Sequence, residues 1–290
     1  MINIVQKHFD FIQRFVGCRP VGSVSNLNLG NYIKKVLEEA GFVLDIQPFQ
    51  CPAWVGEVLD LSINGESFEG IINPFSPPCD VKGSVIALQT IKQLKMADLA
   101  KKIVLLSGEL TSEVLSAKNP FYYPDSVAEI KDLLVRKEPL CVITVPNSRY
   151  NLTPMVEDWE FPIPSISVSA STAIKLMSRT SEEAKITFYS SVTHSHAENI
   201  VAHRWKLGTN KKVVICAHFD TKYYTPGAMD NASGIISLLS LAELFRGQEH
   251  PFDLELIAFN GEEYTGLGEI NYIERYQKTF NDIILVIDLF

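Results

Sequence analysis

The chain has 290 residues, 46% hydrophobic and 21% charged, which is the balance of an ordinary globular protein with one or two domains. Its formal net charge of −8 argues against a nucleic-acid partner, because binding to phosphates requires a basic face. No apolar run approaches the roughly 18 residues of a membrane span, and the N-terminus lacks the basic and apolar segments of a secretory signal.

The first fifty residues predict two helices followed by a strand. Apolar residues recur at helical spacing over residues 5–16, and the sequence Arg-Pro-Val-Gly-Ser at 19–23 interrupts this pattern. A second amphipathic stripe over 32–40 predicts another helix, which Gly41 is expected to end. Residues 42–49 alternate between apolar and polar and predict a strand.

From about residue 51 to residue 190, short strands are expected to alternate with turns. Strands are predicted over 58–63, 85–88, 103–106 and 140–145, and helices over 126–136 and 170–180. Asn64-Gly65 between two alternating runs predicts a hairpin turn. This part has no cluster of His, Asp and Glu at ligand spacing, so we expect a β-rich inserted domain without chemistry of its own.

From residue 191 the pattern becomes strand, helix, strand, helix, strand. Strands are predicted over 213–217, 254–259 and 283–287, and helices over 231–247 and 268–277. This alternation is typical of parallel strands joined by helical crossovers. We therefore expect an α/β fold with a mostly parallel central sheet flanked by helices. Residues 1–50 and 191–290 would form the main domain, with 51–190 inserted.

Side chains that can bind metal follow each of the last three predicted strands. His218 follows the first strand, Glu262 and Glu263 follow the second, and Asp288 closes the third. The carboxyl ends of neighbouring parallel strands meet at one edge of a sheet. Asp230 precedes a predicted helix, where backbone N–H groups favour an anion. Imidazole and carboxylate groups are ligands of hydrolytic divalent cations, so the sequence predicts a site for a pair of metal ions.

Asp220 and the adjacent pair Glu262-Glu263 indicate how such a site would work. Asp220 lies two residues beyond His218 and is expected to accept the second N–H of that ring, which fixes its tautomer. Neighbouring side chains of an extended segment point in opposite directions. One glutamate is therefore expected to hold metal, and the other to face the attacking water as general base. Asp230 is expected to be shared between the two ions.

Several segments resemble the co-catalytic zinc aminopeptidases of metallopeptidase family twenty-eight. The strongest are 218–220 (His-Phe-Asp), 226–234 (Pro-Gly-Ala-Met-Asp-Asn-Ala-Ser-Gly) and 260–263 (Asn-Gly-Glu-Glu). Residues 19–23 with the helix that follows are similar to the family's N-terminal part, and the β-rich middle is similar to its protease-associated insert. The resemblance covers most of the chain, but its specific motifs all lie after residue 215.

The resemblance implies a zinc-dependent exopeptidase, most directly an aminopeptidase that hydrolyses the N-terminal peptide bond of short peptides. It implies two Zn²⁺ ions per complete site, with ligands His218, Asp230, Glu263 and Asp288. Asp230 would bridge the ions, with His218 and Asp288 at one ion and Glu263 at the other. Glu262 would be the general base, and Asp220 would orient His218. The bond between Asp230 and Asn231 is often cis in this family.

The chain departs from the family pattern in two places. After the glutamate pair the family has Gly-Leu-x-Gly-Ser, and here Glu269 replaces the serine. The family's last zinc ligand is a histidine downstream of Asp288, whereas this sequence stops at Phe290. We therefore expect a C-terminally shortened chain in which one metal site lacks a ligand. His194 and His196 are expected to be surface residues.

Two alternative functions remain open. Glutaminyl cyclases look similar around His218 and the glutamate pair, but they bind a single zinc ion and cyclise N-terminal glutamine. The run at 230–234 favours hydrolysis over cyclisation. The other alternative is a non-catalytic binding module, which the missing histidine supports and the intact Asp230 and Asp288 oppose. Assays of amino acid release, ammonia release and metal content discriminate among the three.

The five cysteines are scattered, odd in number and without a Cys-x-x-Cys pair: Cys18, Cys51, Cys79, Cys141 and Cys216. They predict reduced thiols in a cytoplasmic protein, neither a disulfide framework nor a sulfur zinc site. We expect a peptide substrate as the partner. Neither the oligomeric state nor the preferred N-terminal residue can be predicted from these patterns.

Overall fold

The chain forms two compact units. The computed structural model describes residues 2–147, 152–179, 182–206 and 208–290. One unit consists of Met1–Ala53 and His194–Phe290, and the other of Trp54–Thr193. The domain boundaries expected from the sequence, after residues 50 and 190, each lie three residues before these limits.

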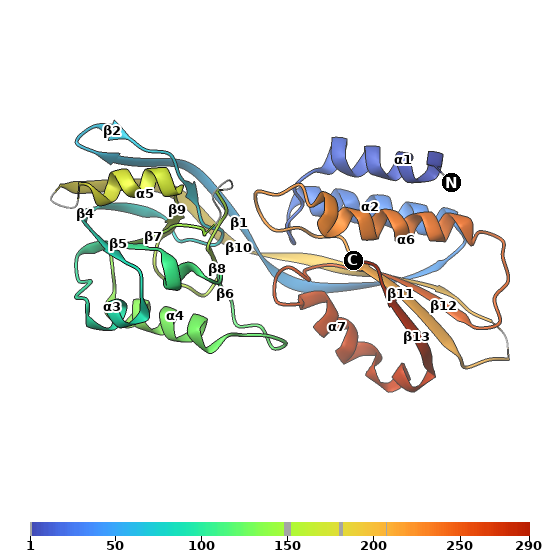
Figure 1. Ribbon diagram of the computed structural model, residues 1–290. Helices are drawn as coiled ribbons and strands as arrows, with labels where there is room; N and C mark the ends of the chain where they lie inside the picture. Colours follow the sequence, from blue (N-terminus) through green and yellow to red (C-terminus); the bar gives the residue numbers. More distant parts are fainter. Residues whose placement is uncertain (1, 148–151, 180–181, 207) are drawn as a thin grey trace. The chain divides into compact units, whose positions relative to one another are not determined.

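The first unit is an α/β unit with a mostly parallel sheet (Figure 1). It contains α1 (Ile2–Phe11), α2 (Val24–Glu39), α6 (Ser233–Leu244), α7 (Leu267–Tyr276), β11 (Lys212–His218), β12 (Asp253–Phe259), β13 (Ile283–Asp288) and parts of β1 (Val43–Ile63) and β10 (Glu183–Arg204). The strand order is β13-β11-β12-β10. β11 is parallel to both β12 and β13, and β10 is antiparallel to β12. The expected fold class is confirmed.

Local sequence signals account for the ends of α2. Ser23 accepts a hydrogen bond from the backbone N–H of Asn26, and this cap starts the helix eight residues earlier than the predicted stripe at residue 32. Gly41, with φ at +88°, ends it as expected, because a residue after a helix often needs the left-handed conformation.

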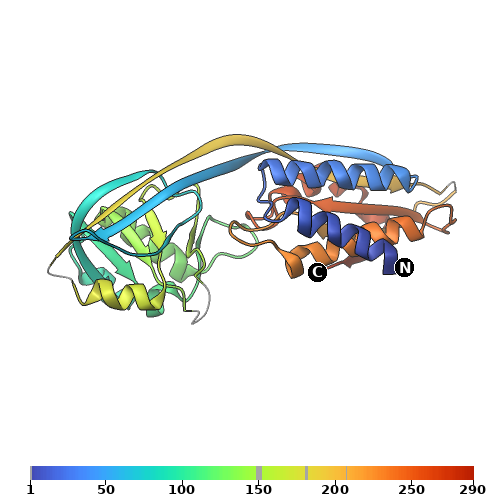
Figure 2. The same cartoon turned by 90° about the horizontal axis from the view of Figure 1, so that it is seen from above.

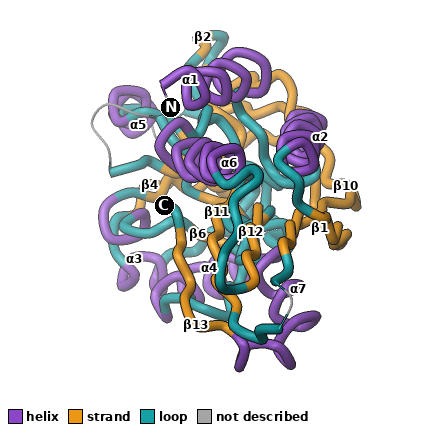
Figure 3. The backbone as a smooth tube through the Cα atoms, turned by 90° about the vertical axis from the view of Figure 1, so that its right-hand side faces the viewer, coloured by secondary structure: helices purple, strands orange, loops and turns teal. Residues whose placement is uncertain are grey.

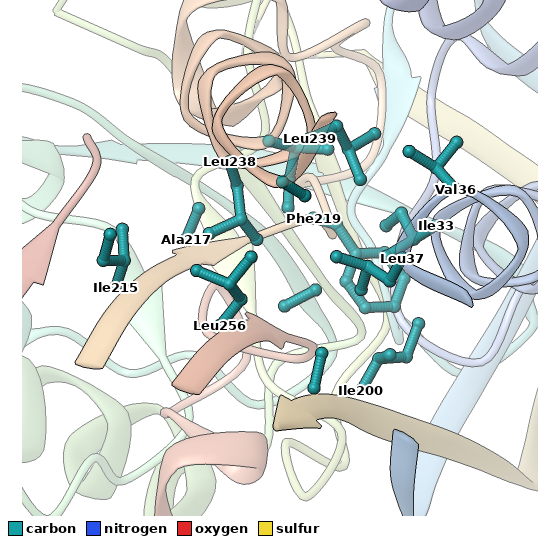
Figure 4. Packing of buried hydrophobic residues seen from close by; sticks show 14 of the residues in the cluster. Ile33, Val36, Leu37, Ile200, Ile215, Ala217, Phe219, Leu238, Leu239 and Leu256 are labelled. Atoms are coloured by element: carbon teal, nitrogen blue, oxygen red, sulfur yellow. The ribbon is translucent and has the colours of Figure 1, made fainter. Parts of the chain in front are cut away.

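Helices cover both faces of this sheet. α1 and α2 both contact α6 on one face, while α7 lies on the other (Figures 2 and 3). Ile215 and Ala217 of β11 pack into the cluster formed with α2 and α6, where Leu238 and Leu239 meet them (Figure 4). Cys216 lies between them in the strand and packs toward Tyr272 of α7. His218 is two residues further along, so it belongs to the α7 face.

The direction of the crossovers places a crevice at the carboxyl ends of β11 and β12. β11 leads to α6 on one face, and β12 leads to α7 on the other (Figure 1). Neighbouring parallel strands whose connections leave toward opposite faces open a crevice between their ends, where open α/β sheets bind ligands. His218 ends β11, and Glu262 and Glu263 follow β12.

The second unit mixes helices with a mostly parallel sheet, so it is less purely β-rich than expected. The strand order is β10, β4 (Cys79–Leu88), β5 (Lys102–Leu106), β7 (Cys141–Thr144), β9 (Ser165–Ser167) and β3 (Ile71–Ile72), with a separate pair of β6 (Leu115–Ser116) and β8 (Val156–Glu157). It also contains α4 (Asp125–Lys137) and α5 (Ala170–Met177), close to the predicted helices, and the unpredicted α3 (Ile91–Met96). Thr90 and Gln93 form a capping box that starts α3.

Two strand predictions differ in outcome. Residues 42–49 and 58–63 were expected as separate strands, but they belong to the single strand β1, which stays extended through Pro52 and Gly56 and pairs with β10. The hairpin at Asn64-Gly65 is confirmed: β1 pairs with β2 (Glu66–Ser67), and both turn residues have positive φ.

Among the described helices, none combines the length and the hydropathy needed to cross a lipid bilayer. The five cysteines are free, as expected.

Candidate metal-binding active site

His218 lies between carboxylates on both sides of its ring. The side chain is buried, and its Nε2 is 2.9 Å from Asp230 Oδ1. The same nitrogen is 3.9 Å from Glu262 Oε2. On the other side, Nδ1 is 3.4 Å from Asp220 Oδ1. Anions on both sides of an imidazole stabilise its protonated form. If a metal cation lies between the imidazole and the carboxylates, the ring can instead stay neutral and bind that cation.

Asp220 links the end of β11 to the turn after β12. This residue is fully buried, and its Oδ1 and Oδ2 accept hydrogen bonds from the backbone N–H groups of Glu262 and Glu263, each at 3.2 Å. The expected position beside His218 is therefore observed. The hydrogen bonds to the turn are an additional role that the sequence did not indicate, because they join residues more than forty positions apart.

The expectation that Glu262 and Glu263 lie in an extended segment is wrong. They form a turn directly after Asn260-Gly261, and both of their N–H groups face Asp220. The two side chains nevertheless differ in environment: that of Glu262 is 43% exposed, whereas that of Glu263 is 12% exposed and has Oε2 4.0 Å from Lys222 Nζ.

From its position in the sequence, Asp230 was expected to lie against a helix N-terminus. Its side chain instead contacts His218 and does not bind the N–H groups at the start of α6. Asn231 takes that role, because its Oδ1 accepts the N–H of Gly234 at 2.8 Å at the start of α6. Asp230 has a non-helical backbone, its side chain is 52% exposed, and its Oδ1 contacts His218. The Asp230–Asn231 peptide bond is cis, as the resemblance implied.

Asp288 reaches the same edge of the sheet but does not contact His218. It ends β13 opposite Cys216 in the parallel pairing, and its Oδ1 lies 3.7 Å from Cys216 Sγ. Within the described residues, no three His, Cys, Asp or Glu side chains are grouped as a metal site. The structure nevertheless places side-chain oxygens of Asp220, Asp230 and Glu262 within 3.9 Å of the His218 ring nitrogens. The ligand roles of His218, Asp230, Glu263 and Asp288 all stay predictions. His194 and His196 are exposed.

The carboxyl groups of this region are crowded and partly buried, which raises the pKa values of several of them. Burial raises the pKa of Glu263 to about 8, and Asp220 and Asp230 raise it further against the opposing effect of Lys222. Burial lowers the pKa of His218, but the negative charges of Asp220, Glu262 and Glu263 outweigh this and the pKa rises to about 9. Carboxylates held in this state and an imidazole are a donor set that fits a divalent cation.

Glu269 adds another carboxyl group beside the site. It lies in the first turn of α7, and its Oε2 is buried and lacks a hydrogen-bond partner within the described part of the chain. Burial raises its pKa to about 8, and the charges of Asp220 and Glu262 act in the same direction. The departure from the family's serine therefore adds a buried carboxyl group near the site.

The metal-free protein is expected to lose stability as pH rises from about 5 to about 9. Folded Glu263, with a pKa of about 8 against 4.5, binds more protons than the unfolded chain in this window, so rising pH favours unfolding. His218 acts in the same sense: its contribution is complete below 6.5 and is lost as pH rises through about 9. Thermal unfolding in chelator should show Tm falling by roughly 5 °C or more. A flat or rising Tm across this window would contradict the electrostatics described above.

Arg19 is a residue of this region whose role the sequence did not reveal. It is fully buried, and its guanidinium donates to the carbonyl oxygens of Phe219 at 2.6 Å, Pro226 at 2.7 Å and Gly227 at 3.1 Å. These carbonyls belong to the loop between His218 and Asp230. The sequence shows only an arginine before a proline, without any signal of burial.

A buried amide network supports the turn that carries the glutamates. Asn26 and Asn260 exchange two side-chain hydrogen bonds, each of 2.9 Å. Asn199 Oδ1 accepts the N–H of Asn260 at 3.2 Å, and its Nδ2 donates to Gly268 O at 2.8 Å. The start of α2, β10 and the start of α7 are therefore all tied to this turn.

Comparison with known proteins finds a family whose model covers this site. The model of the family described as Peptidase family M28 matches residues 199–289, which include His218, Asp230, Glu262, Glu263 and Asp288. The segment that carries the candidate site therefore matches peptidase family M28. The resemblance inferred from the motifs is thus confirmed for the segment that carries the candidate site.

Two bacterial aminopeptidases are similar to this chain in sequence. The probable lipoprotein aminopeptidase LpqL of Mycobacterium tuberculosis is 24% identical over 265 residues, which cover 89% of this chain and 51% of that protein. Aminopeptidase YwaD of Bacillus subtilis is 32% identical over 66 residues, covering 23% of this chain and 14% of that protein. The chain therefore spans about half the length of LpqL.

Solved structures show the same fold. BSAP, a zinc aminopeptidase from Bacillus subtilis, superimposes with a TM-score of 0.79 at 21% identity, covering 98% of this chain and 68% of that chain. An aminopeptidase from Aneurinibacillus sp. strain AM-1 gives a TM-score of 0.72 at 20% identity, covering 98% and 69%. The mixed α/β architecture described above is therefore the fold of these M28 proteins.

Proposed function

We propose that this protein is a zinc-dependent exopeptidase, and specifically an aminopeptidase that hydrolyses the N-terminal peptide bond of short peptides. The observation that carries the proposal is the contact of His218 with Asp230, backed by Asp220 and flanked by Glu262, inside the segment that matches family M28. The aminopeptidase names of LpqL and YwaD and the zinc of BSAP support it.

The residues assigned to zinc binding follow from donor chemistry and from the family motif. His218, Asp230, Glu263 and Asp288 would hold the metal, with two Zn²⁺ ions in a complete site. The bound metal supplies a Lewis acid that polarises the scissile carbonyl and makes the attacking water more acidic. Asp230 is suited to contact more than one cation, because one of its oxygens faces His218 while its side chain remains half exposed.

Glu262 is assigned as general base. A base must reach the water that attacks the substrate, and this side chain is 43% exposed at the edge of the sheet, with its carboxylate near His218. Burial raises the pKa of Glu262, with the charges of Asp220 and Asp230 adding to this rise, which makes the carboxylate a better proton acceptor. The proton would then pass to the departing amine. Asp220 would hold the His218 ring in the tautomer that carries its proton on Nδ1. The lone pair of Nε2, which faces Asp230, would then be free for metal.

Metal analysis together with product analysis tests the proposal. We expect purified protein to bind about two zinc ions, and to release free N-terminal amino acids from short peptides in a reaction that chelator stops and Zn²⁺ restores. Ammonia release from a glutaminyl peptide, without release of free amino acids, would favour a cyclase instead. Protein that binds no zinc and cleaves no peptide would favour a non-catalytic binding module.

A further inference from the structure

We propose that Arg19 is a positioning residue for this site, which fixes the backbone of residues 219–227 between His218 and Asp230. The inference rests on the proposed function in so far as these two residues are taken as metal ligands. Its structural part, the fixing of the loop, stands on the contacts of Arg19 alone.

The guanidinium of Arg19 binds the loop at both of its ends. Nε donates to Phe219 O, directly after His218, and the two terminal nitrogens donate to Pro226 O and Gly227 O, shortly before Asp230. One terminal nitrogen also donates to Gly17 O at 3.0 Å. A planar group with five N–H donors is suited to hold carbonyls that diverge in this way, and a lysine ammonium at a single point is not.

The main chain of Arg19 binds the middle of the same loop. Its N–H donates to Thr221 Oγ1 at 2.9 Å, and its carbonyl accepts the N–H of Thr221 at 3.3 Å. Side chain and backbone together therefore hold the loop at its beginning, middle and end. Without the guanidinium, the carbonyl of Phe219 would lose its buried donor, and a buried unpaired carbonyl is costly.

The end of the loop is packed closely enough to transmit a shift to Asp230. Gly227 has φ at +53°, and a Cβ placed on it would lie 2.3 Å from Thr221 Cγ2 and 2.5 Å from Asp230 O. Gly227 O, which accepts from Arg19, also accepts the N–H of Ala232 at 3.0 Å. A displacement of Gly227 therefore moves the residues on both sides of Asp230.

Arg204 provides a matched control in the same unit. Like Arg19, it donates to backbone carbonyls, at 2.6 Å to Phe245 O and at 2.8 Å to Ala40 O, and it lies over the Phe42 ring. These partners are the C-cap residues of α6 and α2, at the ends of those helices that lie away from the site loop. Loss of Arg204 should therefore lower overall stability without a specific effect on residues 219–232.

The test compares Arg19→Met, Arg19→Lys and Arg204→Met. Amide hydrogen exchange of residues 219–232 in metal-free protein should be about tenfold faster or more in both Arg19 variants than in Arg204→Met. Zinc affinity, measured by chelator competition, should fall about 10- to 100-fold in the Arg19 variants only. Equal exchange in this segment for the Arg19 and Arg204 variants overturns the proposal, whatever their activities.

These readouts separate the failure of the inference from the failure of the proposed function. If wild-type protein binds no zinc, the proposed function fails, and the exchange comparison still decides whether Arg19 fixes the loop. If zinc binds and peptides are cleaved while exchange and affinity are unchanged in Arg19→Lys, only the role of Arg19 is refuted. Should Arg19→Met not fold, Arg19→Lys and Thr221→Val, which removes one acceptor of Arg19, give the same comparison.

Discussion

Glu262→Gln should lower kcat for peptide hydrolysis by about 10³-fold while leaving zinc content unchanged. Glutamine has the size and polarity of glutamate but cannot accept a proton from the attacking water. The side chain of Glu262 is the more exposed of the pair, and its backbone N–H bond to Asp220 does not depend on the side chain. The turn should therefore keep its conformation. Steady-state kinetics with a short peptide, together with zinc analysis of the purified variant, measures both effects.

Glu243→Gln is the matched control for this experiment. Glu243 is also a partly buried glutamate of the same unit, 15% exposed, but it bonds to Lys7 of α1 and lies outside the site. Its replacement should leave kcat within about twofold of wild type and cost only a fraction of the stability, as partly exposed ion pairs usually do. Normal turnover in Glu262→Gln would refute the general-base role, and loss of zinc would make Glu262 a ligand instead.

The location of the site could be predicted from local patterns because it depends on the ends of parallel strands. Apolar runs that end at His218 and Asp288 identify strands, and the alternation with helices makes those strands parallel. Only β11 is buried, because β13 lies at the edge of the sheet with most of its side chains exposed. Parallel strands share a carboxyl edge, so the polar residues after them necessarily approach one another. Gly41 and Asn64-Gly65 were predictable for a related reason: the signal and its structural effect lie within a few residues.

The internal geometry of the site was not predictable because its constraints come from distant parts of the chain. The turn at Glu262-Glu263 follows from hydrogen bonds to Asp220, and the loop after His218 follows from Arg19, two hundred residues earlier. Asn231, and not Asp230, accepts the backbone N–H at the start of α6, because either side chain suits that position and only the surrounding contacts decide between them. A single sequence, taken by itself, gives no signal for such long-range pairs.

The insert shows the same limit at the level of secondary structure. The sequence predicted separate strands over 42–49 and 58–63, but β1, which pairs with β10, continues through Pro52 and Gly56. Tertiary pairing thus overrides a local preference that amounts to about 1 kcal/mol for glycine. The helices α4 and α5 have strong apolar periodicity and were found, whereas α3 has only six residues and was not.

Asp220→Asn should reduce kcat/KM by about 10²- to 10⁴-fold and weaken zinc binding by about 10- to 100-fold. The carboxylate has two acceptor oxygens for the N–H groups of Glu262 and Glu263, and it faces His218 Nδ1. Asparagine supplies one acceptor oxygen and an NH₂ group. One backbone N–H would then face another donor, or the amide would donate to Nδ1 and leave the ring proton on Nε2. In the second case the nitrogen that faces Asp230 loses its lone pair for metal.

Asp45→Asn separates this effect from the general loss of a hydrogen-bonded acid. Asp45 accepts hydrogen bonds from Arg275 and Tyr276 at the amino ends of the strands, so its loss should cost stability without changing zinc affinity. Competition with a zinc chelator and a pH–rate profile measured on both variants distinguish the two residues. The Asp220 variant should lose affinity across the whole pH range, because the defect lies in the tautomer rather than in net charge. Equal zinc affinity in the two variants would show that Asp220 supports only the fold, and that the orientation of His218 is set by the packing around it.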